Sequence, residues 1–346
     1  MLESLKFQNF TAFDKLDVKF APGINIFIGE NGTGKTHILK VAYAACAIAK
    51  TKGVFAEKLI NVFYPSGKQI GRLIKRSKKS TTGSVEVSRS VNKKNVSIKL
   101  SFSSHTIKPE KATLTGSTKI WKASPLEAVF IPVKDMMANA PGFSSLFEAR
   151  EIHFEEVYVD IIRKVFLPFL KGPTDRERKR LLEILQKAIS GKIFLNNEEF
   201  FLRSEQGELE FTLLAEGFRK LGLLWVLLQN GTLTKGSTLF WDEPETNLNP
   251  KLMQQVVNIL IELQRIGVQV FLATHNYVLL KEFDLQLKNG DNCFFHSLFR
   301  NENGLIEISS TSNYLEINPN AIDETYGSFI DREIKKSMGN LGKNET

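Results

Sequence analysis

The segment GENGTGKT at residues 29–36 is the feature that most constrains how this chain can fold. It matches the pattern G-x-x-x-x-G-K-[ST], and it stands between a β-branched run at residues 24–28 and an apolar-periodic stretch at residues 38–45. A glycine-rich loop between a strand and a helix binds phosphate, because its backbone amides and the helix N-terminus point at the anion. The sequence therefore predicts an α/β fold of the P-loop NTPase type, with ATP and Mg²⁺ as its ligands.

Individual positions of this loop have separate expected roles. Lys35 is expected to reach the β- and γ-phosphates, and the Thr36 hydroxyl is expected to take a place on Mg²⁺. His37 is expected to face solvent or the ribose. The backbone cradle around the phosphates is expected from Asn31, Gly32, Thr33 and Gly34.

A second cluster of polar residues follows two further apolar runs. Residues 238–243 are typical of a strand that ends in Asp242 and Glu243, and residues 268–273 are typical of a strand that leads to His275. A strand, a helix and a second strand form a parallel unit, so these polar residues meet at one edge of the sheet. We expect Asp242 to hold Mg²⁺ through water and Glu243 to act as the general base on the attacking water.

In this order the motifs resemble those of an ABC-type ATPase head, with His275 as the switch histidine. The resemblance implies that two heads pair, and that the signature segment of one head contacts the nucleotide bound to the other. It also implies a catalytic set of Lys35, Glu243 and His275, and a nucleotide contact in trans through Ala215, Glu216 and Gly217. The segments that carry the resemblance are Walker A at residues 29–36, Walker B at 239–243, the D-loop at 247–249 and the signature position at 214–221.

The chain departs from the transporter pattern of this family at two places. At the signature position Ala215 replaces a serine and Glu216 replaces a glycine, and we expect Arg219 or Lys220 to supply compensating charge. After a strand at residues 128–132, the sequence Val-Lys-Asp stands where a glutamine is usual. These departures predict slow hydrolysis, and they count against a transporter subunit.

The N-terminal residues indicate which subgroup of ABC-type ATPase heads the chain resembles. Residues 7–13, FQNFTAF, followed by a strand into the glycine-rich loop, resemble the heads of the RecF, SMC and OLD group. Residues 130–143 and 317–322 resemble the small ABC-type ATPases of bacterial anti-phage systems, such as AriA of PARIS and the Septu ATPases. No heptad repeat is sustained, and no D-x-D cluster follows His275, so we expect neither a long coiled coil nor a built-in nuclease. An effector is then expected to act in trans.

The expected organisation interleaves an ATPase core with a β-rich insertion and a helical signature lobe. The insertion is expected because residues 84–91 and 96–102 alternate between apolar and polar at period two. The expected segments are residues 1–50, the N-terminal core with the phosphate loop; 51–125, the basic β-rich insertion; 126–142, a core strand and the segment in the Q-loop position; 143–236, the helical lobe with the signature; and 237–346, the C-terminal core and a final helix.

Positive charge is concentrated between residues 67 and 99. This stretch holds ten Lys and Arg against Glu86 alone, whereas the whole chain carries a net charge of +8. One interpretation is an ordinary solvated loop surface, and the other is a docking site for DNA, RNA or an acidic protein that mimics them. The cations are Lys68, Arg72, Lys75, Arg76, Lys78, Lys79, Arg89, Lys93, Lys94 and Lys99.

Composition excludes several other classes of protein. Two cysteines cannot build a disulfide framework or a cysteine zinc site. No apolar run approaches the length of a membrane span, and the N-terminus has no basic region followed by an apolar one. We therefore expect a cytoplasmic protein without a membrane partner.

Two functions fit these observations. The first is a slowly hydrolysing ATPase switch that forms a homo-oligomer through its heads and controls an effector or nuclease in anti-phage defence. The alternative is a RecF-like DNA-binding ATPase in DNA repair.

Overall fold

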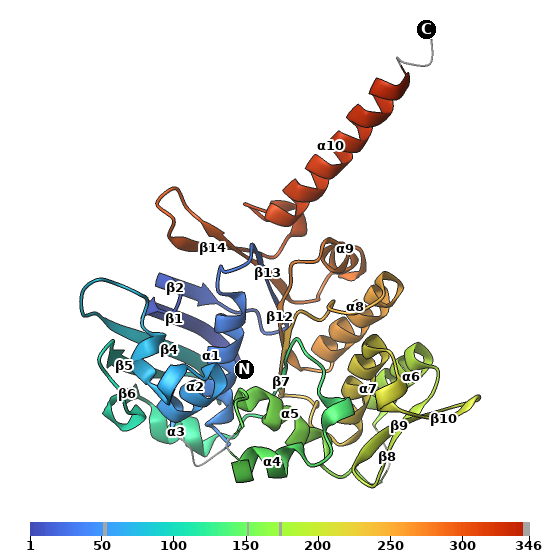
Figure 1. The fold of residues 1–346 in the computed structure, drawn as a ribbon, viewed down its shortest axis with the longest axis horizontal. Coiled ribbons are helices and arrows are strands. Elements are labelled where there is room, and N and C mark those ends of the chain that lie inside the picture. Colours follow the sequence, from blue (N-terminus) through green and yellow to red (C-terminus); the bar gives the residue numbers. More distant parts are fainter. Residues whose placement is uncertain (51–53, 151, 173–174, 342–346) are drawn as a thin grey trace.

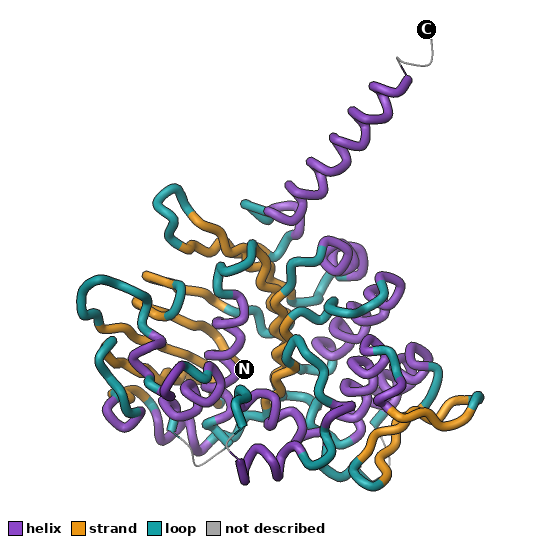
Figure 2. The backbone as a smooth tube through the Cα atoms, in the orientation of Figure 1, coloured by secondary structure: helices purple, strands orange, loops and turns teal. Residues whose placement is uncertain are grey.

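The computed structural model describes residues 1–50, 54–150, 152–172 and 175–341. In these ranges the chain forms a six-stranded central sheet, a five-stranded antiparallel sheet and a three-stranded sheet. Figure 2 shows the three groups of strands: the antiparallel sheet at the left, the central sheet in the middle and the small sheet at the lower right.

The central sheet carries the phosphate loop. Its strands have the order β14-β13-β3-β12-β11-β7, and all pairs are parallel except the edge pair of β13 and β14. The four strands β3, β12, β11 and β7 are buried at every position, as expected for parallel strands covered on both faces. Their bounds are β3 (Ile24–Gly29), β7 (Ala128–Ile131), β11 (Thr238–Asp242), β12 (Gln269–Ala273), β13 (Cys293–Arg300) and β14 (Ile306–Thr311).

The two faces of the central sheet belong to different hydrophobic cores. Phe27, Phe240 and Phe271 pack with helix α1 (Lys35–Ala47), so α1 lies between the central and the antiparallel sheets. Alternate residues of the same strands, such as Trp241 and Leu272, pack with the helices of the opposite layer. That layer contains α6 (Arg176–Ile189), α7 (Glu216–Gln229), α8 (Pro250–Arg265) and α9 (Tyr277–Gln286) (Figure 1).

The antiparallel sheet joins the N-terminus to the segment expected as an insertion. The order β2-β1-β4-β5-β6 makes β4 a direct partner of β1, with Leu5 opposite Val87. Period-two alternation places Val85 and Val87 on the same buried face as Leu5 and Phe7, so the strands that follow helix α2 (Phe55–Phe63) continue this sheet. The strands are β1 (Leu2–Phe10), β2 (Phe13–Lys19), β4 (Thr82–Val91), β5 (Lys94–Ser103) and β6 (Thr113–Gly116), and the short helix α3 (Thr118–Ala123) follows them.

The segment from residue 143 to 236 contains helices and the small sheet. Asp175 caps α6 by accepting a hydrogen bond from the backbone amide of Arg178, which fits the preference for aspartate at helix N-termini. The three strands pair as a meander in front of α7. The elements before α7 are α4 (Phe143–Arg150), α5 (Glu156–Val165), α6, β8 (Lys192–Asn196), β9 (Glu199–Ser204) and β10 (Gly207–Glu210).

Helix α10 (Ala321–Leu341) ends the described chain and projects from the body (Figure 1). It is the longest helix in the described ranges, at 21 residues, so the part of the chain that the structure covers has no long coiled-coil arm. Within the same ranges no helix is both long and apolar enough to cross a bilayer.

Candidate nucleotide-binding and hydrolysis site

The phosphate loop has the backbone that its glycines allow. Gly29, Gly32 and Gly34 all have positive φ angles, of 137°, 77° and 90°. A Cβ on Gly29 would lie 2.1 Å from the Leu298 carbonyl oxygen, and one on Gly34 would lie 2.5 Å from the Phe13 ring. The tight loop therefore needs glycine both for its backbone angles and for its close neighbours.

Lys35 begins α1 and folds back over the loop. Its Nζ donates hydrogen bonds to the carbonyl oxygens of Gly29 at 2.7 Å and Glu30 at 2.9 Å. Burial lowers the pKa of Lys35, whereas the carboxylates of Glu243 and Asp242 act in the opposite direction. The ammonium group is thus held at the loop, where it can neutralise a bound phosphate.

Thr36 and Asp242 meet although 206 positions separate them. The Thr36 hydroxyl donates to Asp242 Oδ1 at 3.0 Å, because β3 and β11 both pair with β12 and end at the same edge of the sheet. Asp242 is nearly buried, and burial raises the pKa of its carboxyl group to about 6. A hydroxyl and a carboxylate oxygen at this spacing fit Mg²⁺, a hard cation that prefers oxygen ligands.

Glu243 and His275 face each other at the ends of β11 and β12. Glu243 adopts a left-handed backbone with φ 48°, and its amide donates to the Ala273 carbonyl oxygen at 2.9 Å. Its Oε2 accepts a hydrogen bond from Thr246 Oγ1 at 3.1 Å, and its Oε1 lies 3.6 Å from His275 Nδ1. The fold therefore brings the expected base and the expected switch histidine together.

Sequence reasoning missed Glu245 at this edge. Its carboxyl is buried, and Oε1 accepts hydrogen bonds from Thr274 Oγ1 at 2.7 Å and from the His275 amide at 3.1 Å. The available signal was a third carboxylate in the sequence DEPE, directly after the pair already assigned.

The signature segment lies against the D-loop of the same chain. Ala215 is the N-cap of α7 and offers no side-chain hydrogen bond, so the first amides of α7 lack a side-chain cap. Glu216 Oε2 accepts a hydrogen bond from Asn247 Nδ2 at 2.7 Å. Gly217 is buried, and a Cβ there would lie 3.3 Å from the Asn247 carbonyl oxygen.

The expectation that Arg219 or Lys220 supplies charge to a partner's nucleotide is wrong. Arg219 Nε lies 2.8 Å from Asp135 Oδ2, and the fully buried Lys220 donates to the Thr246 carbonyl oxygen at 2.5 Å. Both cations lie on the inward face of α7, where they hold neighbouring segments of their own chain.

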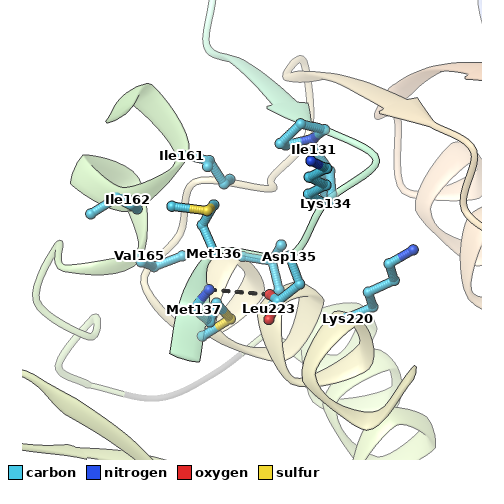
Figure 3. A pocket seen from close by; sticks show the side chains of 11 residues that line it. Ile131, Lys134, Asp135, Met136, Met137, Ile161, Ile162, Val165, Lys220 and Leu223 are labelled. Carbon is cyan, nitrogen blue, oxygen red and sulfur yellow. Dashed lines mark hydrogen bonds between the residues drawn. The ribbon is translucent and has the colours of Figure 1, made fainter. Parts of the chain in front are cut away.

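Asp135 links the segment in the Q-loop position to the signature helix. It lies between Met137 and the α7 residues Lys220 and Leu223, at a small apolar cavity (Figure 3). Its Oδ1 accepts a hydrogen bond from the Met137 amide at 3.2 Å, and burial raises the pKa of its carboxyl group. With no glutamine in this segment, Asp135 makes a structural contact to Arg219.

His37 does not face solvent as expected. Its ring packs on Phe63 with ring centroids 5.4 Å apart. Burial, with a smaller contribution from Lys40, lowers the pKa of His37 to about 4. The side chain points to the α2 side of α1 because the next residue after Thr36 lies about 100° around the helix.

The basic stretch is not one surface. Arg89 is buried: its guanidinium lies 4.4 Å from the Trp121 ring centroid and donates to the Ser124 carbonyl oxygen at 2.8 Å. Lys93 and Lys94 lie at the turn between β4 and β5, about 30 Å along the strands from the residues near Thr82. The single cationic cluster expected for residues 67–99 is therefore divided by the fold.

A new cationic patch forms at the other end of this hairpin. The Gly71 amide donates to the Thr106 carbonyl oxygen at 2.8 Å, and the Ser104 amide donates to the Thr81 carbonyl oxygen at 2.9 Å. These bonds bring two loops together. Their exposed cations, which we call the loop-end patch, are Arg72, Arg76, Lys78, Lys79, Lys108 and Lys111.

Comparison with known proteins agrees with this geometry. The family model described as "AAA domain, putative AbiEii toxin, Type IV TA system" matches residues 121–281, which include the signature segment, Asp242, Glu243 and His275. The DNA replication and repair protein RecF of Listeria welshimeri is 37% identical over 76 residues, covering 22% of this chain and 20% of RecF. RecF of Lactobacillus acidophilus is 52% identical over 42 residues, covering 12% of this chain and 11% of RecF. The chain thus matches about a fifth or less of the length of these curated relatives.

Solved structures resemble the chain over most of its length. An SMC head bound to the C-terminal winged-helix domain of ScpA superposes with a TM-score of 0.59 at 13% identity, covering 90% of this chain and 97% of that one. The Smc head of Pyrococcus furiosus gives a TM-score of 0.56 at 13% identity, covering 96% and 99%. The fold is that of an ABC-type P-loop ATPase head, which confirms the expected fold class. Within that class the chain is similar to AAA, RecF and SMC ATPases, and the likeness to particular anti-phage ATPases stays a prediction.

Proposed function

We propose that this chain binds ATP with Mg²⁺, hydrolyses it slowly, and acts as a switch whose heads pair when ATP is bound. The hydrogen bond between Thr36 and Asp242, with Glu243 and His275 at the same sheet edge, carries this proposal. The place where the terminal phosphate of ATP would lie is then surrounded by a phosphate-binding loop, two oxygens that fit Mg²⁺ and a carboxylate base.

Each residue has a role that follows from its place. The loop amides and Lys35 bind the phosphates, and Thr36 with Asp242 would hold Mg²⁺. Bound Mg²⁺ neutralises charge on the phosphate oxygens. Glu243 accepts a proton from the attacking water, and His275, in the segment after β12, would lie on the γ-phosphate side of the site.

Two features support slow hydrolysis. Asp135 forms an ion pair with Arg219. It stands where ABC-type ATPase heads have the glutamine that lines the attacking water. Glu216 adds a negative charge at the start of α7, where a partner's phosphate would approach, and this charge opposes head pairing.

The switch is proposed to control a protein effector in anti-phage defence. The match to the AbiEii-type family model supports this assignment. A RecF-like role on DNA is the second candidate, and it is supported by the RecF matches and by the loop-end patch, which offers several exposed cations to a phosphate backbone.

Light scattering during size-exclusion chromatography tests the switch. With ATP and Mg²⁺, Glu243→Gln should accumulate as a dimer or larger assembly, whereas Lys35→Ala should stay monomeric. Glu183→Gln and Lys187→Ala change exposed residues of α6 and serve as matched controls that should behave as wild type. Equal assembly of the two site variants with and without ATP would refute the switch.

Purification of tagged Glu243→Gln from its native cells in ATP separates the two functions. A stoichiometric protein partner without nucleic acid favours the effector switch. Nucleic acid that is lost in high salt or on nuclease treatment favours the DNA role.

A further inference from the structure

Glu245 is a buried carboxyl that neither nucleotide contact nor helix capping explains. Its side chain is only 4% exposed, although glutamate is rarely buried without a compensating interaction. It lies on the turn after β11, and the cap of α8 is a different residue, Asn249, which accepts from the Lys251 amide at 3.0 Å. The burial of Glu245 therefore has to be compensated by what its oxygens contact.

Both side-chain hydrogen bonds of Glu245 reach the neighbouring strand end. Oε1 accepts from Thr274 Oγ1 at 2.7 Å and from the His275 backbone amide at 3.1 Å. The last ladder pair between the two strands is Asp242 with Ala273, and backbone hydrogen bonds continue one residue further, from the Glu243 amide to the Ala273 carbonyl oxygen at 2.9 Å and from the Thr274 amide to the Phe27 carbonyl oxygen at 3.0 Å. Glu245 is a side-chain bridge that continues this connection past the end of the ladder.

The bridge matters for His275 because the ring is not held by packing. The His275 side chain is 50% exposed, and its Nδ1 lies 3.6 Å from Glu243 Oε1 and 3.8 Å from Glu245 Oε1. A half-exposed ring takes its position mainly from its backbone, and Glu245 anchors that backbone at the amide.

We propose that Glu245 is a positioning residue for hydrolysis: it fixes the backbone of His275 so that the ring stays beside Glu243. This inference rests on the proposed ATPase function. It assigns Glu245 no contact with the nucleotide, and it separates Glu245 from Glu243, whose carboxylate is proposed to accept the proton.

Because the two oxygens of Glu245 differ in their contacts, variants can separate the role of the acceptor oxygen from the roles of the charge and the side-chain length. Oε2 is buried and has no hydrogen-bond partner among the described residues, so the bridge uses one acceptor oxygen. Glu245→Gln keeps an acceptor oxygen of the same reach and removes the charge. Glu245→Ala removes the bridge, and Glu245→Asp keeps the charge but shortens the side chain by one methylene.

Steady-state kinetics gives the first test. Glu245→Ala should lower kcat by about 10- to 100-fold with little change in KM, because misplacing one active-site group costs this much. Glu245→Gln should keep most of the activity, unlike Glu243→Gln. The double variant Glu245→Ala/His275→Ala should lose no more activity than His275→Ala alone, because the two residues act through one ring. Multiplicative losses in the double variant would overturn the proposal.

Hydrogen exchange gives a second test that does not depend on turnover. Exchange of the His275 amide, which donates to Glu245, should rise by about 10-fold or more in Glu245→Ala and Glu245→Asp, and stay at the wild-type rate in Glu245→Gln. If wild type hydrolyses no ATP, the proposed ATPase function fails, and this measurement still decides the role of Glu245. Unchanged exchange in both Ala and Asp variants would overturn the positioning role.

Discussion

The nucleotide edge of the central sheet and the loop-end patch of the antiparallel sheet both carry basic side chains, but they hold them differently. At the nucleotide edge Lys35 and Lys220 are buried and bonded to backbone carbonyls. In the loop-end patch Arg76, Lys78 and Lys79 are exposed. A buried cation keeps its position in a low dielectric, whereas exposed cations are screened by salt. The first arrangement suits chemistry at one atom, and the second suits a diffuse charged partner.

The largest effect should come from removing the buried cation of the phosphate loop. Lys35→Ala deletes a charge that would contact the phosphates in the ground and transition states, so we expect turnover to fall by at least about 100-fold. The measurement is phosphate release at saturating ATP, with Lys187→Ala as control. Turnover within a few-fold of wild type would contradict the assigned role of Lys35.

The contrast between buried and exposed cations also predicts a difference in the free energy of unfolding. Arg89 belongs to the basic stretch in sequence, but it is buried against Trp121 and donates a charged hydrogen bond to the Ser124 carbonyl oxygen. Arg89→Ala should lower the free energy of unfolding by about 2–3 kcal/mol, because a charged hydrogen bond and its packing are both lost. Urea denaturation measures this, with exposed Lys99→Ala as the matched control. Equal stability of the two variants would show that burial of Arg89 is not energetically important.

His37 is a half-buried base with a lowered pKa, and it gives a pH dependence. Its folded pKa of about 4 lies below the ordinary value of 6.5, so the unfolded chain binds the proton more readily. Stability contributed by His37 is therefore present above about pH 6.5 and is lost as the pH falls toward 4. We expect His37→Phe to reduce that loss by about 1–3 kcal/mol in unfolding experiments between pH 7 and pH 4.5. His296, whose pKa burial lowers to about 3, remains in the variant and contributes its own loss. An unchanged pH profile would contradict this assignment.

The smallest effect on stability should come from the loop-end patch. The combined change of Arg76, Lys78 and Lys79 to Ala should alter the free energy of unfolding by no more than about 0.5 kcal/mol. If the patch binds duplex DNA, the slope of log affinity against log salt should fall by up to about 2.7, or about 0.9 for each lost phosphate contact. Lys93→Ala/Lys94→Ala, at the opposite end of the hairpin, is the matched control. Equal salt slopes for both variants would show that the loop-end patch makes no more phosphate contacts than the opposite end of the hairpin, which would contradict DNA binding at the patch.

The sequence predicted the fold class and the positions of the site motifs because both are local patterns. Gly29 and Gly34 have no side-chain alternative in a loop of this shape, and a strand ending in Asp242 and Glu243 brings its carboxylates to the sheet edge. The meeting of Thr36 with Asp242 and of Glu243 with His275 followed from parallel strand order alone.

Other features depended on contacts between distant segments. The local alternation places Arg89 on a strand and Lys93 in the following turn, but it does not show that α3 supplies the Trp121 ring and the carbonyl oxygen that bury the Arg89 guanidinium. Arg219 and Lys220 carry charges that a helix pattern would place in solvent, but Asp135 and the Thr246 carbonyl oxygen receive them.

The sequence by itself determined which chemical groups this protein has and which turns hold them, because glycine, proline and strand patterning act within a few residues. Beyond the pairs that strand order brings together, only the tertiary structure decided which of those groups meet. Glu245 became a bridge to His275, and Lys108 and Lys111 joined Arg72 and Arg76, because strand register and loop packing set distances between residues far apart in the chain. Hydrogen bonds and charge interactions depend on those distances, so their partners are a property of the folded molecule.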